Sequence, residues 1–446
     1  MDTSIKVPVN INDMPPEILL HIFDFLGIPV PSEARLHDQP CATLLDNQPK
    51  LQSLKPATLV CKSWRSLALP GLFQHVLWRP QVSSLSAFTL NPIPLLRFLE
   101  DNHLDRSVHT FTLLVDFVDE WADAHRRTPQ IRSVDLEWFW DQLFAVIDPL
   151  RFTIIAPPTT LAAFLSRMLF LDDAWSFDMP YHILSLSRTE RDSPSSTGRH
   201  LDTSLSDPKI AAAKSDSEGS QPATTVAGSS SRDPVSCSSR RRAPPCLLFT
   251  ARRWTALLLN EGSSTKVYRT YEFFLRRPPS MLGALLGCEE FPNDTPLVPS
   301  SVVEFSYVAI FPLSTQLQIL AHNLPRIDRL FVRLTPGPGS RHLLEDPAEM
   351  RHIDPADLWM ERDTAYKTLI RGILATIFPA AAIIDPADRN SNWTALQVFE
   401  SGDDREALDA GYDLFQGVPL RGWKIEGDGR MFVRCHEGDE GGIVVT

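Results

Sequence analysis

Cysteine is scarce in this sequence, and the few cysteines share no spacing that would give them a common role. Six cysteines occur among 446 residues, and no two of them form a Cys-x-x-Cys pair. Neither a disulfide framework nor a zinc ribbon is therefore indicated. We expect reduced thiols in a cytoplasmic or nuclear protein, with no cofactor and no bound metal.

Long apolar runs and an excess of basic residues are also missing. The longest run without Asp, Glu, Lys or Arg, residues 305–325, contains Pro312, Gln316 and Asn323 and is too polar for a membrane span. The first residues lack the apolar core of a signal peptide, so no secretion is expected. A net charge of −12 argues against a general nucleic-acid binder or a binder of anionic membranes.

Familiar catalytic motifs are absent as well. No Gly-x-x-x-x-Gly-Lys, Gly-x-Gly-x-x-Gly or His-Glu-x-x-His pattern occurs, so phosphate-loop, dinucleotide and zincin sites lack support. Cys435 and His436 are neighbours whose side chains would point to opposite faces of a strand. The sequence therefore predicts a protein without catalysis of its own.

What the chain does have is an amphipathic N-terminal segment. Pro15, Pro16 and Glu17 suit the first turn of a helix, where missing N–H groups cost nothing and a negative charge is favourable. Two apolar stripes follow at helical spacing: Ile18, Ile22 and Phe25 on one line, and Leu19, Phe23 and Leu26 on the next. One stripe is expected to pack on a second helix, which contains Val60, Trp64 and Leu67, and the other is left for a partner; an ordinary core helix pair is the alternative.

This segment, residues 12–80, resembles an F-box, the helical module by which substrate receptors bind the Skp adaptor of Skp/cullin/F-box ubiquitin ligases. The matching residues are Met14, Pro15, Glu17, Ile18, Ile22, Phe25, Leu26, Leu59, Val60, Cys61, Trp64, Leu67, Leu72, Phe73 and Trp78. The family usually has Leu at the position of Met14. The resemblance implies adaptor contacts by Pro15, Glu17, Ile18, Leu19, Ile22, Leu26, Leu59, Val60, Cys61, Trp64, Leu67, Leu72 and Trp78.

A second departure is the link between the two helices, residues 27–53, which is longer than usual and contains four prolines. A long loop adds little closure entropy. We expect this link to loop out from the module.

Beyond the module, composition divides the chain into two apolar parts around a polar one. After an N-terminal tail (residues 1–11) and the module, residues 81–186 and 246–446 show strand-like runs followed by helical patterns, such as 109–116, 150–155, 302–308 and 327–334. Residues 187–245 are rich in serine and proline and are predicted to be a disordered insertion. The fold class is thus α+β: a three-helix F-box, then an α/β region that is either an irregular leucine-rich-repeat-like array or an α/β layer.

Two further features of the α/β part are visible in the sequence. Trp138, Phe139, Trp140 and Phe144 are either core residues or a protein-binding hot spot. The end of the chain, residues 414–434, resembles a hairpin with a Gly-Asp-Gly turn.

The resemblance implies a substrate receptor that links an unknown protein substrate to the Skp adaptor, and through it to cullin, for ubiquitination and degradation. The ligase chemistry would belong to other subunits. The alternatives are an F-box scaffold that acts outside the ligase and an enzyme with an unrecognised site in the C-terminal region.

Overall fold

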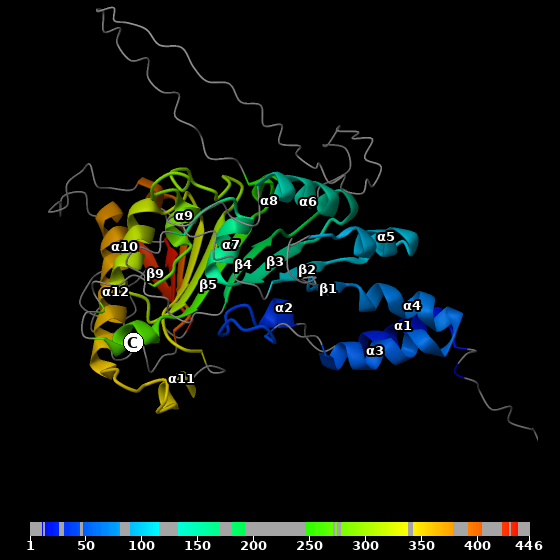
Figure 1. Ribbon diagram of the computed structural model, residues 1–446. Helices are drawn as coiled ribbons and strands as arrows, with labels where there is room; N and C mark the ends of the chain where they lie inside the picture. The colour runs from blue at the N-terminus through cyan, green and yellow to red at the C-terminus, as the bar shows by residue number, and fades with distance from the viewer. Residues whose placement is uncertain are drawn as a thin grey trace, which may run out of the picture.

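The computed structural model describes residues 11, 14–25, 31–44, 48–80, 90–115, 133–169, 181–191, 246–270, 273, 278–337, 342–377, 391–403, 422–427 and 430–435. In this part of the chain, four helices at the N-terminus precede a mixed α/β region built on one sheet (Figure 1). Among these helices, none combines the length and the apolar character needed to cross a membrane.

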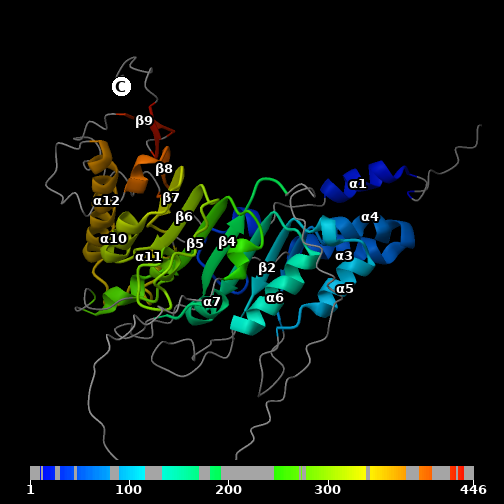
Figure 2. The same ribbon diagram turned by 90° about the horizontal axis from the view of Figure 1, so that it is seen from above.

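The described strands form one ten-stranded, mostly parallel sheet in the order β1-β2-β3-β4-β5-β6-β7-β8-β10-β9. Only β4 and the last two strands pair in the antiparallel sense. Strands β1 to β8 follow one another in chain order, and β10 then lies between β8 and β9. Figure 2 shows the sheet running from the side of the N-terminal helices to β9. The strands are β1 (His75–Trp78), β2 (Thr110–Leu114), β3 (Arg151–Ala156), β4 (His182–Ser187), β5 (Ala256–Ser263), β6 (Glu304–Ile310), β7 (Arg329–Arg333), β8 (Val398–Ser401), β9 (Trp423–Glu426) and β10 (Met431–Arg434).

Helices cover one face of this sheet. The larger ones, such as α6, pack on it through a single apolar core, while α2 lies on the opposite side of the strands (Figure 1). The helices are α1 (Pro16–Phe25), α2 (Pro31–Ala34), α3 (Gln48–Val60), α4 (Lys62–Leu72), α5 (Ile93–Asp101), α6 (Ser133–Val146), α7 (Pro158–Phe164), α8 (Leu247–Thr250), α9 (Leu282–Leu286), α10 (Ser314–Asn323), α11 (His342–Glu345) and α12 (Pro355–Ile377).

The sequence of the strands explains why the face of the sheet beneath the helices is buried. Side chains alternate between the two faces of a strand, and every second residue of the central strands is large and apolar. Phe152, Leu257 and Phe305, for example, are almost fully buried in the core beneath the helices. The aromatic cluster of α6 belongs to this core: Phe139, Trp140 and Phe144 are buried, which settles the alternative in favour of packing for these three residues.

The two α/β parts share this sheet. β4 precedes residues 192–245 and β5 follows them, and these two strands pair directly. Residues 192–245 of the predicted insertion lie outside the described residues. Its predicted start at residue 187 is too early, because Ser187 ends β4 and Arg188 is buried.

Several strand predictions match the described structure. The runs at 109–116, 150–155, 302–308 and 327–334 become β2, β3, β6 and β7, and the end of the chain forms the antiparallel pair β9 and β10.

Candidate functional site

Of the N-terminal helices, α1 and α3 expose several large apolar side chains. On α1 and at the end of α3, six of them are exposed to solvent; we call them the docking surface. Their exposed fractions are 47% for Ile18, 42% for Leu20, 38% for Ile22, 90% for Phe25, 81% for Leu59 and 58% for Val60. Exposed apolar side chains gathered on two helices are typical of a protein-interaction site.

The neighbouring stripe of α1 packs inside the module, while the residues of the docking surface stay exposed. Leu19 and Phe23 are buried against Leu54, Ala57 and Ala68, which form a small separate core. Phe23 also meets Trp64 edge to face, with 5.5 Å between ring centroids. Because this stripe already fills the space between the helices, the docking surface has no described partner within the chain.

A cysteine side chain caps the N-terminus of α4. Cys61 is exposed, and its Sγ accepts a hydrogen bond from the backbone N–H of Trp64 at 3.5 Å. Sequence comparison with the F-box pattern predicted an adaptor contact here, and the structure adds a capping role for the same side chain.

The residues predicted to bind the adaptor therefore divide into groups. Pro15, Glu17, Ile18, Ile22, Leu59, Val60 and Cys61 are exposed. Leu19 was also predicted to contact the adaptor, and this prediction is corrected: its side chain is buried in the module's own core and does not lie at the surface. Trp64, Leu67 and Leu72 pack partly into the same core, and Leu26 lies outside the described residues.

Trp78 belongs to a different part of the molecule. It lies in β1 and stacks on Phe139 of α6, with 5.8 Å between ring centroids. Its contacts are therefore with the core of the sheet. Leu20 and Phe25 were not among the predicted contacts. Phe25 continues the stripe of Ile18 and Ile22, whereas Leu20 lies about 180° around the helix from that stripe, beyond the buried Leu19 and Phe23.

A second candidate region is the face of the sheet that the large helices leave open. Strand register places its side chains in three rows across the sheet. The first row holds Thr110, Arg151, Ser187, Ala256, Glu304 and Arg329; the second holds Thr112, Thr153, Ser185, Leu258, Ser306, Phe331 and Glu400; the third holds Leu114, Ile155, Ile183, Asn260, Val308 and Arg333. Most of the first two rows is polar, as expected for a face turned away from the main core.

The link between α1 and α3 covers part of this open face. Residues 31–44, which we call the strap, were expected to loop out from the module. Instead, Leu36 and Leu44 are buried in a cluster with Leu114, Ile155 and Leu258. This corrects the prediction, and the physical reason is that the strap's apolar residues meet apolar residues of the second and third rows.

Polar contacts fix the strap as well. Asn260, fully buried in β5, donates from Nδ2 to the backbone oxygens of Leu36 and Asp38, each at 2.8 Å. The hydroxyl groups of Ser32 and Thr110 lie 3.2 Å apart. His37 packs on Phe331, and burial is the main reason why its pKa is lowered to about 4, with the charge of Arg333 acting in the same direction.

Apart from Thr110, which contacts Ser32, the strap leaves the first row accessible, and a cavity of about 530 Å³ lies there. Its lining includes Arg151, Ser187, Ala256 and Glu304 from the first row and Glu33 from the strap. Burial lowers the pKa of Arg151, and the nearby charge of Glu33 opposes this shift.

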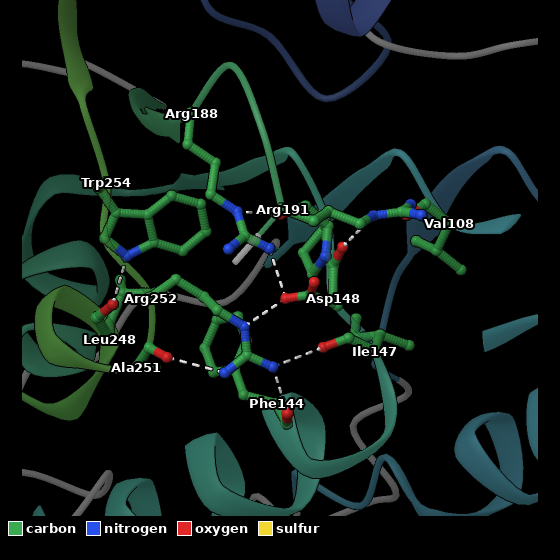
Figure 3. A network of polar contacts seen from close by, with 11 residues as sticks. Val108, Phe144, Ile147, Asp148, Arg188, Arg191, Leu248, Ala251, Arg252 and Trp254 are labelled. Atoms are coloured by element: carbon green, nitrogen blue, oxygen red, sulfur yellow. Dashed lines mark hydrogen bonds and ion pairs between the residues drawn. The ribbon is translucent and has the colours of Figure 1, made fainter. Parts of the chain in front are cut away.

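An arginine cluster lies beside this cavity (Figure 3). Arg188 and Arg252 converge on the carboxylate of Asp148, with 2.5 Å between Arg252 Nε and Asp148 Oδ1. Arg188 also lies over the indole ring of Trp254, and Arg191 donates to the backbone oxygens of Asp148 and Val108. These contacts join the end of β4 to the loop before β3, so we assign the cluster a structural role.

Two other buried ionisable groups, Glu261 and Cys246, have surroundings that account for them. Glu261 accepts hydrogen bonds from Ser280, the Met281 N–H and Tyr307, while burial raises its pKa to about 6. Burial raises the pKa of the Cys246 thiol to about 12, which makes it a poor nucleophile at neutral pH.

No group of three or more His, Cys, Asp or Glu side chains within the described ranges could hold a metal ion. Comparisons of the chain with models of protein families, with curated proteins and with solved structures find no match.

Proposed function

We propose that this protein is an F-box substrate receptor: the N-terminal helices bind the Skp adaptor through the docking surface, and the α/β region binds a protein to be ubiquitinated. The observation that carries the proposal is the division of α1 into two stripes. Leu19 and Phe23 fill the module's own core, whereas Ile18, Ile22 and Phe25 remain exposed.

The energetic argument concerns the cost of this exposure. Burying apolar surface stabilises by about 25 cal/mol per Å², so a chain that leaves six large apolar side chains in water gains substantially when a partner covers them. Central, fully covered apolar residues supply most of the affinity of such interfaces. An adaptor that covers α1 and the end of α3 therefore has a physical reason to bind.

The α/β region supports the second half of the proposal. Strands β1 to β8 follow one another in chain order with helices on one face, an arrangement also found in leucine-rich-repeat-like arrays. The strap covers part of the other face, and the cavity at the first row remains accessible. An accessible cavity on a sheet of this size suits the recognition of another protein. The chain itself would contribute proximity, by raising the effective concentration of the substrate near the conjugating enzyme.

The direct test is binding of a purified Skp adaptor to the full-length chain, measured by calorimetry or pull-down. Ile18→Asp combined with Leu59→Asp should weaken binding at least about 100-fold, because each carboxylate would be buried without a partner. Met360→Asp is the matched control, since Met360 is 53% exposed but lies on α12.

The melting temperature of both variants should stay close to that of the parent, because all three side chains are exposed. Undiminished adaptor binding by the double variant, or no binding by the parent, would contradict the proposal. If the chain and adaptor co-purify from cells without cullin, the scaffold function replaces the ligase function.

A further inference from the structure

The open cavity at the first row of the sheet contains charged side chains that the fold does not pair with each other. Arg151 is half-buried in it, yet in the described chain its guanidinium makes no hydrogen bond or ion pair, and Glu33 acts on it only through longer-range charge. A guanidinium group carries five N–H donors, and desolvating them without acceptors is unfavourable. The Arg151 guanidinium is therefore suited to bind an acidic group of a ligand.

The charges around Arg151 restrict the net charge of the acidic group that can bind there. Glu33 and Glu304 also line the cavity, and the other nearby guanidinium, that of Arg188, is already paired with Asp148. A doubly charged phosphate would meet two carboxylates with one available cation. A singly charged carboxylate fits the balance better, and it binds a guanidinium in bidentate geometry.

Glu304 defines a second position. It lies in the same row as Arg151, three strands away. With about 4.8 Å between neighbouring strands, the two Cα atoms are separated by roughly 14 Å. An extended peptide covers this distance in about four residues.

The surface between the two charges suits a peptide backbone. Ser187 and Ala256 are the residues of the row between Arg151 and Glu304, and Val303 beside them is 38% exposed. Small and hydroxyl side chains allow close approach of an extended chain. The volume of about 530 Å³ lies within the range of ordinary ligand sites.

We propose that this cavity binds an extended peptide segment of the substrate protein, in which an acidic side chain pairs with Arg151 and a basic side chain about four residues away pairs with Glu304. This inference rests on the proposed function and names the substrate feature that the receptor recognises. Glu33, which comes from the link between the adaptor-binding helices, limits the site to ligands with a single negative charge at Arg151.

The test uses a library of random 12-residue peptides displayed on phage, selected against the full-length chain. The parent should enrich peptides that carry Asp or Glu three to five positions from Lys or Arg. Arg151→Ala should lose the acidic preference alone, and Glu304→Gln the basic preference alone. Arg326→Ala is the control: Arg326 is exposed between α10 and β7 and does not line the cavity, so its selection should match that of the parent.

A peptide selected on the parent is then synthesised and its affinity measured. Arg151→Ala should weaken it at least about tenfold, a change of about 1.4 kcal/mol, and replacing its acidic residue with phosphoserine should weaken it as well. The proposal is overturned if no charged pair is enriched, if Arg151→Ala selects the same peptides, or if the phosphoserine version binds more tightly.

The adaptor measurement separates this proposal from the proposed function. A chain that binds the adaptor but enriches no charged pair refutes the peptide site alone. A chain that enriches the pair but does not bind the adaptor keeps the peptide site and refutes the receptor function.

Discussion

Replacing Asn260 should release the strap from the sheet. The side chain is fully buried and makes three hydrogen bonds: Nδ2 donates to the backbone oxygens of Leu36 and Asp38 at 2.8 Å, and Oδ1 accepts from the N–H of Gly262 at 3.0 Å. Asn260→Ala would leave two buried acceptors and one donor without their partner.

The magnitude follows from these contacts. Leaving a buried polar group unsatisfied costs about 1–3 kcal/mol, and water admitted by the smaller side chain recovers part of this. We therefore expect the free energy that holds the strap closed to fall by about 2–4 kcal/mol. Opening of the strap also exposes Leu36 and Leu44, so the loss should appear as local opening before global unfolding.

Hydrogen exchange of residues 31–44, followed by mass spectrometry, is the appropriate assay. Exchange in the strap should accelerate by about 30-fold or more in Asn260→Ala, as 2 kcal/mol implies, while exchange in β6 and β7 changes little. Asn323→Ala is the matched control, because Asn323 donates to the backbone oxygen of Ile319 at an exposed position. Equal exchange rates in the parent and in Asn260→Ala would refute the assignment of Asn260 as the residue that fixes the strap.

Three further predictions concern stability. Leu19→Ala should destabilise the N-terminal helices by about 2–4 kcal/mol, whereas Ile22→Ala, at an exposed position, should change the urea midpoint little. Burial lowers the pKa of His182 to about 3, so its contribution to stability is complete above pH 6.5 and is lost as the pH falls; between pH 7 and 5.5 the parent should lose about 1 kcal/mol more than His182→Gln in chemical denaturation. Gly287 has φ +71° and an added Cβ would lie 2.2 Å from the nitrogen of Pro296, so Gly287→Ala should lower the melting temperature by several degrees; an unchanged value would contradict this close approach.

The parts of the fold that could be predicted depend on short-range pattern. The two stripes of α1 are visible as helical spacing, and the structure buries Leu19 and Phe23 of one stripe while Ile18, Ile22 and Phe25 of the other stay exposed. Strands such as β3 and β6 are visible as apolar runs with nearby helices. In each case the information lies within about fifteen residues, where periodicity is informative.

The strap could not be predicted for the opposite reason. Its prolines and polar residues are typical of a surface loop, and its binding site on the sheet is formed by residues far away in sequence, with Leu36 and Asn260 separated by 224 positions. Arg188 was placed in the disordered insertion for the same reason, because its partner Asp148 lies 40 positions earlier in the sequence. The cavity was equally out of reach, since it depends on the register that places Arg151 and Glu304 in one row.

The separation between the strap and Asn260 has a consequence for the newly made chain. A ribosome adds roughly 5–20 residues per second, so about 10–40 s pass between synthesis of residue 44 and of residue 260. During that interval the N-terminal helices have all the residues they need for their own core, whereas the strap has no β5 to bind. The docking surface is therefore complete well before the open face of the sheet. If it binds an adaptor as proposed, an adaptor present during translation would meet this surface before the cavity on the sheet has formed.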